Sequence, residues 1–171
     1  VVLNAPVIAV VKRAVGVVSL GSDIYEVTYR IIFKNLSSVS TAYNVMGSDD
    51  LSVTYPAPTV FSVISNSIVS GALSANVSFT GSGASADLLN GLNHLAPLAS
   101  SELELKVRVD VSATNQRVFN NSVLAFASST DGGVVSTTDT SNNGDASSFD
   151  TDSDGNPNEV IDNNPTPVNL V

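Results

Sequence analysis

The sequence predicts an all-β fold, a sandwich of two mostly antiparallel sheets. Two long segments, Ile24–Lys34 and Glu102–Val111, alternate apolar and polar residues. Successive side chains of a strand point to opposite sides, so each segment would have one buried and one exposed face. The other apolar runs are short and separated by Ser, Asn, Gly and Pro, and no segment has a convincing helical period. With 171 residues, the chain is long enough for one domain with a substantial core.

Weaker patterns indicate further strands before, between and after these two. They are Val7–Ala14, Ala42–Met46, Val60–Ile64, Ser67–Ser70, Ala75–Thr80, Phe119–Ala127 and Gly133–Thr138. Ala86–Leu92 indicates at most a short helical turn. Segment 141–167 is rich in Asn, Asp, Ser, Gly and Pro and has few apolar residues to bury. We therefore predict a sandwich over residues 1–140, and over residues 141–171 an acidic loop and a proline-marked exit strand of the same domain.

Composition excludes several functions. The chain has no cysteine, which excludes disulfides, thiolate catalysis and cysteine zinc sites, and its one histidine, His94, excludes a histidine metal cluster within one chain. An acidic chain without a basic stripe is a poor nucleic-acid binder. No run of 18 apolar residues is present, so no membrane span is expected.

The net charge of −9 is concentrated near the C-terminus. Residues 1–117 hold eight acids and seven Lys or Arg, whereas residues 118–171 hold eight acids and no Lys or Arg. One interpretation is a solvated acidic tail. The interpretation we favour is that an external cation neutralises these carboxylates.

The segment from Asp150 to Asp162 has the spacing of a calcium loop. Aspartates at alternate positions followed directly by a glycine resemble the start of an EF-hand loop, but Ile161 stands where that loop needs its bidentate glutamate, so a looser loop is predicted. Magnesium is disfavoured because it takes fewer protein ligands, and a plain acidic turn remains the alternative. The expected ligands are Asp150, Asp152, Asp154, Asn156, Asn158, Glu159 and Asp162.

Other polar residues favour structural roles. Asp49-Asp50 is expected to cap a turn, with a calcium site shared with a neighbouring copy as the alternative. His94 is the only candidate base for a serine, so a catalytic triad is not expected, and a chain without Trp does not suggest a glycosidase cleft. Lys12, Lys34 and Lys106 lie in predicted strands, and some surface repeats cross-link a strand lysine to an asparagine beside a buried acid. We expect exposed lysines instead, because Lys34 and Lys106 fall on outward positions.

The two ends of the chain are both extended, apolar and marked by proline. If one copy followed another, the end would continue directly into the start. This indicates a unit of a tandem array or a subunit that exchanges terminal strands. The residues expected to act as an inter-subunit strand or linker are Val1, Val2, Leu3, Pro165, Pro167, Val168 and Leu170.

Three groups of motifs, taken in order, resemble a known family. They are Val7–Lys12 with Tyr25–Asn35; Leu88–Pro97 with Glu102–Val109; and Phe119–Ala125 with Asp139–Asn143, Asp150–Pro157 and Asp162–Val168. Together they resemble the conserved-repeat family of large bacterial surface proteins, a domain of unknown function. The resemblance covers nearly the whole chain and implies an Ig-like Greek-key sandwich, tandem arrays, a structural or adhesive role and no catalytic residues. One departure is Ala96–Ser101, where family members usually carry more glycine.

These observations predict a structural repeat or subunit of an extracellular bacterial surface fibre or adhesin, stiffened by calcium, and not an enzyme. Its partners would be neighbouring copies of the same domain, with a host-surface or glycan ligand as a further partner. One alternative is a pilus-like filament subunit joined by terminal strand exchange. Another is a carbohydrate- or ice-binding adhesin module.

Overall fold

The computed structural model describes residues 5–171 and confirms the all-β fold. Within these residues, strands dominate and helical structure is limited to two short turns. The elements are β1 (Ile8–Gly21), β2 (Ile24–Asn35), β3 (Tyr43–Ser48), α1 (Leu51–Thr54), β4 (Val60–Ser70), the 3-10 turn η1 (Gly83–Ser85), β5 (Ser100–Asp110), β6 (Val118–Asn121), β7 (Leu124–Ser128), β8 (Val135–Thr140), β9 (Asn142–Asn143) and β10 (Thr166–Asn169).

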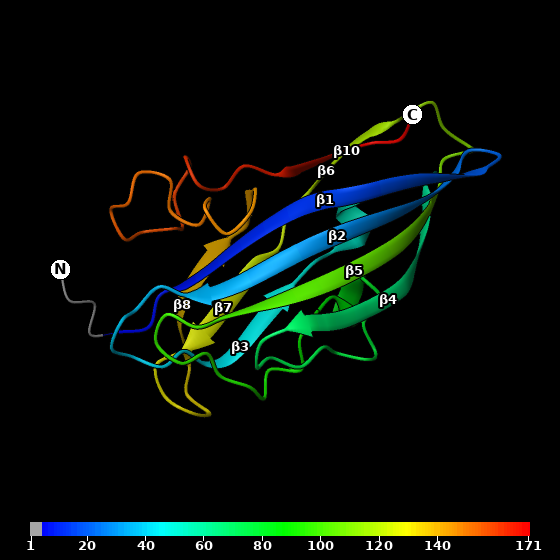
Figure 1. The fold of residues 1–171 in the computed structure, drawn as a ribbon. Helices are drawn as coiled ribbons and strands as arrows, with labels where there is room; N and C mark the ends of the chain where they lie inside the picture. The colour runs from blue at the N-terminus through cyan, green and yellow to red at the C-terminus, as the bar shows by residue number, and fades with distance from the viewer. Residues whose placement is uncertain (1–4) are drawn as a thin grey trace.

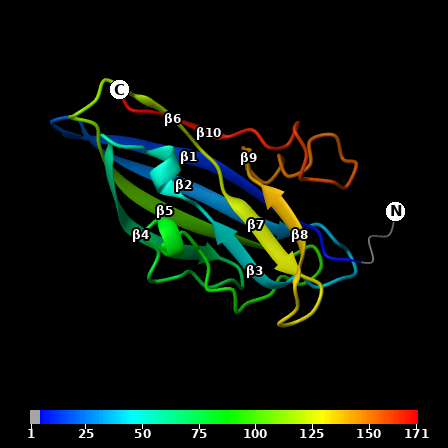
Figure 2. The same cartoon turned by 180° about the vertical axis from the view of Figure 1, so that it is seen from behind.

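The strands form two layers (Figures 1 and 2). One layer is a five-stranded sheet in the order β4-β5-β2-β1-β9, and the other contains the sheet β3-β7-β8, with the pair β10-β6 at one side. All pairings are antiparallel except that of β1 with β9. If β1, β2, β5 and β4 are compared with strands A, B, E and D of an immunoglobulin constant domain, then β3, β7 and β8 correspond to C, F and G. The expected Ig-like sandwich is therefore the observed architecture.

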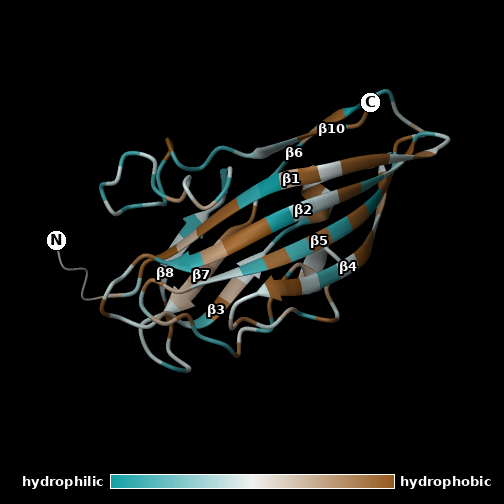
Figure 3. Ribbon diagram, in the orientation of Figure 1, coloured by the Kyte–Doolittle hydropathy of each residue, from teal (hydrophilic) through white to brown (hydrophobic). Residues whose placement is uncertain are grey.

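The alternating segments form the two central strands, β2 and β5. In β2, every second residue from Tyr25 to Phe33 is buried. The outward residues form ion pairs across the sheet, with Arg30 lying 3.2 Å from Glu102 and 2.9 Å from Glu104. Partly exposed pairs of this kind each contribute less than about 1 kcal/mol, so the alternation is stabilised mainly by burial of the inner face. Figure 3 shows the resulting bands of hydrophilic and hydrophobic residues.

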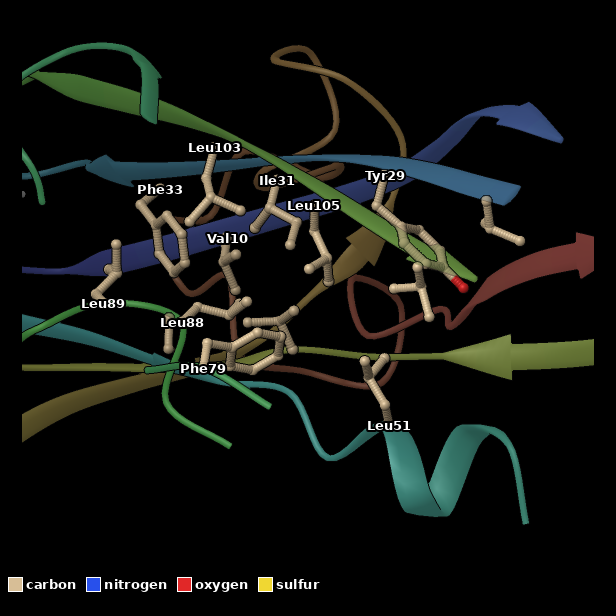
Figure 4. Close-up of a cluster of buried hydrophobic side chains, with 14 of the residues drawn as sticks. Val10, Tyr29, Ile31, Phe33, Leu51, Phe79, Leu88, Leu89, Leu103 and Leu105 are labelled. Carbon is tan, nitrogen blue, oxygen red and sulfur yellow. The ribbon is translucent and has the colours of Figure 1, made fainter. Parts of the chain in front are cut away.

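The core lies between the layers (Figure 4). Phe33, Leu103 and Val10 of the five-stranded sheet face Leu88 and Phe79, which come from the long connection between β4 and β5. This connection has little regular structure, but it covers part of the core as a strand would.

The structure corrects several weaker predictions. Ser67–Ser70 is not a separate strand, because β4 continues through it with two register shifts. Phe119–Ala127 is split into β6 and β7. Ala75–Thr80 is not a strand, since Asn76 Oδ1 accepts from Ser78 N–H and Asn76 O accepts from Phe79 N–H, which closes a turn. Ala86–Leu92 forms isolated bridges with residues 48 and 75 rather than a helical turn.

Gly47 permits the close approach of the two layers, and Gly47→Ala should destabilise the fold. A β-carbon at Gly47 would lie 2.6 Å from the fully buried Phe33 ring, so the ring or the strand would have to shift. Overpacking of this kind typically costs about 1–3 kcal/mol of unfolding free energy, measurable by urea denaturation. The matched control is Gly16→Ala, whose new β-carbon would meet nothing closer than Thr28 at 3.8 Å. Equal stability of the two variants would contradict the prediction.

Candidate functional site

The acidic loop connects β9 to β10 and extends beyond the β1 side of the five-stranded sheet (Figure 1). Asp150 organises its first turn: Oδ1 accepts from Ser153 N–H and Oδ2 from Gly155 N–H, both at 2.8 Å. Gly155 has φ +93°, a conformation that glycine adopts without strain. The Asp-Gly spacing therefore forms the tight turn that the sequence predicts.

The loop brings five of the expected ligands together in two overlapping clusters. Carboxylate oxygens of Asp150, Asp152 and Asp162 lie within 4.8 Å of one another, and so do those of Asp152, Asp154 and Glu159. Asp152 belongs to both clusters. Asp162, eleven residues after Thr151, is fixed in place by accepting from Thr151 N–H at 2.9 Å.

The clusters hold carboxylate oxygens that lack partners. Asp162 is 1% exposed, and its Oδ2 has no hydrogen-bond partner among residues 5–171. Glu159 Oε1 is likewise enclosed and unpaired within these residues. Local burial, and then the charges of Asp154 and Asp152, raise the pKa of Glu159. No ion pair between described side chains includes any of the five clustered acids. Hard cations bind oxygen sets of this kind, and calcium tolerates their irregular geometry.

The two expected asparagine ligands are placed differently. Asn156 is exposed, and its backbone N–H donates to Asp154 Oδ1 at 2.7 Å. Asn158 donates from Nδ2 to Thr138 Oγ1 at 3.4 Å, and its Oδ1 accepts from Asn163. Cation ligation by these two residues stays a prediction.

Asp139 is a further buried acid, close enough to Asp162 for the two charges to interact. Its Oδ2 accepts from Val10 N–H at 2.6 Å, whereas its Oδ1 has no partner among the described residues. Burial raises the pKa of Asp139 to about 8, and the charge of Asp162 adds to this shift. The negative charge of the loop therefore acts on Asp139, at the place where β8 contacts β1.

The expected terminal strand lies within this chain's own sandwich. β10 pairs with β6, and Val168 and Leu170 are buried in the core, while Pro165 and Pro167 are exposed. Exchange of this segment with a neighbouring copy would first require it to leave its own core. The N-terminal residues Val1, Val2 and Leu3 lie outside the described residues.

A second polar cluster lies inside the sandwich. Two of the three strand lysines face outward as expected, but the third does not. Lys12 of β1 is fully buried, and its Nζ lies 2.5 Å from Oδ2 of Asp49, which is also fully buried. Asn121, at the end of β6 and 1% exposed, donates from Nδ2 to the same oxygen at 3.4 Å. The Tyr29 ring lies 4.3 Å from Lys12 Nζ. Three residues far apart in the sequence thus meet at one carboxyl group.

The acidic pair that was expected to cap a turn divides between two roles. Asp50 accepts from Ser52 N–H at 3.0 Å and is the N-cap of α1, which confirms the capping prediction for this residue. Asp49 faces the interior instead. His94 accepts from Asn44 N–H at 3.2 Å and packs on Tyr43.

No protein-family model and no curated protein matches this sequence. Among residues 5–171, no helix has both the length and the apolar character needed to cross a membrane. The features of the chain that bear on function are therefore its fold and its two polar clusters.

Proposed function

We propose that the chain is a structural module of an extracellular bacterial surface fibre or adhesin, in which calcium stiffens the acidic loop. The observation that carries the proposal is the pair of overlapping carboxylate clusters around Asp152, together with the buried, unpartnered Oδ2 of Asp162. The Ig-like sandwich supports it, because this architecture forms stable beads in many cell-surface proteins. The resemblance to surface-protein repeats supports the same role.

Calcium would act between the loop and the bead. The loop begins beside β1, where Gly144 N–H donates to Lys12 O, and ends at Thr166, which donates to the same carbonyl from Oγ1 at 2.9 Å. Both ends of the loop are thus fixed to one point of the sandwich, and the carboxylates lie between them. A cation that joins these carboxylates would order the segment and fix the exit direction of the chain.

Calcium should raise the melting temperature in calorimetry. A ligand at about one hundred times its Kd stabilises a protein by about 2.7 kcal/mol, which corresponds to roughly 5–10 °C for a domain of this size. Asp152→Asn should abolish most of the shift, because Asp152 belongs to both clusters. Asp145→Asn is the matched control, since Asp145 lies in the same segment but outside both clusters.

An unchanged melting temperature in calcium and in chelator would refute the calcium part of the proposal. An equal shift with magnesium would indicate general charge screening instead. Neither result would refute the structural role, which depends on how the native protein is assembled.

The size of the native polymer tests the structural role and separates it from its main alternative. One very long polypeptide in denaturing gels supports a repeat within a fibre. A ladder of small subunits supports filament assembly by strand exchange, in which β10 or the N-terminal segment would complete a neighbour's sheet. A native protein that is a single small monomer would contradict both.

A further inference from the structure

The buried cluster of Lys12, Asp49 and Asn121 has the components of an amide-forming reaction. An amine, a carboxamide and a carboxyl group meet in a site from which solvent is excluded. Because Lys12 Nζ and Asn121 Nδ2 both contact Asp49 Oδ2, their separation cannot exceed the sum of two hydrogen-bond distances. The carboxyl oxygen of Asp49 therefore bridges the amine of Lys12 and the carboxamide of Asn121.

The surroundings favour the neutral forms of the amine and the acid. Burial lowers the pKa of Lys12 and raises the pKa of Asp49, in each case against the attraction between the two groups. Asp49 Oδ1 has no hydrogen-bond partner among residues 5–171, so an ionised carboxylate would be incompletely solvated. When the proton of this 2.5 Å contact is on Asp49, Lys12 is a free amine and can act as a nucleophile. Asp49 is then a carboxylic acid and can donate a proton.

We propose that Lys12 Nζ attacks Cγ of Asn121, so that the folded chain forms an internal Lys12–Asn121 amide cross-link. The new bond joins Nζ to Cγ, and the bond from Cγ to Nδ2 breaks. One Nζ proton leaves with Nδ2 through Asp49, and ammonia is the leaving group. The reaction consumes no other reagent and changes no oxidation state.

Each neighbouring group has a role in this step. Asp49 accepts a proton from Lys12 and passes one to Nδ2, because its Oδ2 contacts both nitrogens. Thr54 Oγ1 donates to Asn121 Oδ1 at 3.0 Å, where negative charge develops when Cγ becomes tetrahedral. The Tyr29 ring covers the amine, and its hydroxyl is 2.6 Å from that of Tyr55, so the aromatic pair closes the site. Figure 4 shows Tyr29 extending from β2 into the core.

The fold explains why the reaction would follow folding and why its product would persist. Lys12, Asp49 and Asn121 are brought together only when β1, β6 and the end of β3 have packed, so cross-linking follows folding. Holding the amine and the carboxamide on one carboxyl oxygen removes part of the entropic barrier to amide formation. The product is buried, so water cannot readily reach the amide to hydrolyse it. The cross-link requires neither the calcium loop nor the fibre role.

The test is the intact mass of the denatured 171-residue chain. The wild type should be lighter than its sequence mass by one ammonia molecule, and a proteolytic digest should contain a branched peptide joining Lys12 to Asn121. Lys12→Met, Asp49→Asn and Asn121→Ala should each have the full mass of their sequence. Loss of the proton-transferring acid in Asp49→Asn should slow the reaction at least about a hundredfold.

Matched controls separate the cross-link from other losses of ammonia. Lys34→Met and Asn120→Ala remove a lysine and an asparagine outside the cluster and should still lose ammonia. Cyclisation of an asparagine onto its own backbone also releases ammonia but does not need Lys12, so a loss that persists in Lys12→Met would overturn the proposal. A wild type that is folded by circular dichroism and has its full sequence mass would overturn it without reference to any variant.

Discussion

The wild-type chain should melt roughly 10–20 °C above Asn121→Ala, because a cross-link from Lys12 to Asn121 closes a loop of about 110 residues. In the chain-entropy description, closing a loop of this length stabilises the folded state by about 4–5 kcal/mol relative to an open unfolded chain. That is a large part of the stability of an ordinary domain. The measurement is calorimetry, with urea denaturation as a second determination.

Single variants also lose local contacts, so the cross-link is isolated with a double-mutant cycle. Lys12→Met and Asn121→Ala each abolish the bond, and the double variant cannot abolish it twice. The coupling energy should therefore approach about 4–5 kcal/mol, whereas noncovalent neighbours usually couple by about 0.5–3 kcal/mol. Coupling within the noncovalent range would contradict a covalent link. The pair Lys34→Met and Asn120→Ala is the control cycle and should be additive.

The sequence predicted the central strands well because their two faces differ in environment. In β2 and β5, one face packs on the core and the other bears ion pairs, so alternation is visible in the residues themselves. The same rule fails for the start of β1. There Ile8 to Lys12 are all buried, because Phe149 of the acidic loop and Leu36 cover Ala9 and Val11 on the outer face. The alternation that revealed the faces of β2 and β5 is therefore missing around Lys12.

The two polar clusters differ in predictability for a related reason. The carboxylate clusters are built within thirteen residues of one loop, so spacing alone brought Asp150, Asp152 and Asp162 into one prediction. The Lys12 site draws one residue each from β1, the end of β3 and the end of β6. Its assembly depends on how the sheets stack, and no local pattern contains that information. The one available signal is a lysine directly after an unbroken apolar run, at the same parity as Ile8 and Val10.

The buried cluster and the acidic loop meet at the same place in the fold. The Lys12 carbonyl accepts from Gly144 N–H and Thr166 Oγ1, at the two ends of the loop. Thr166 is also the register partner of Asn121. A cross-link would thus join β1 to the strand that holds the C-terminal segment, and calcium would fasten the loop that lies between them. Both the cross-link and the bound calcium would resist separation of the first and last strands of the domain.

Force applied to the two ends of the chain should therefore leave most of the sandwich folded. A load entering through the start of β1 would pass from Lys12 through the amide to Asn121, and from there into residues 122–171. Residues 13–120, which include the whole of β2, β3, β4 and β5, would lie outside the load path. At roughly 3.4 Å per extended residue, about 35 nm of chain should stay hidden.

Single-molecule stretching measures this directly as the length released on unfolding. Wild type should release only the residues outside 13–120, whereas Asn121→Ala should release the full sandwich, longer by about 35 nm. Asn120→Ala has an intact cluster and should behave as wild type. Equal release lengths for wild type and Asn121→Ala would contradict a shielded core. If calcium also fixes the loop, wild type in calcium should need a higher force to release residues 122–171 than wild type in chelator, with the released length unchanged.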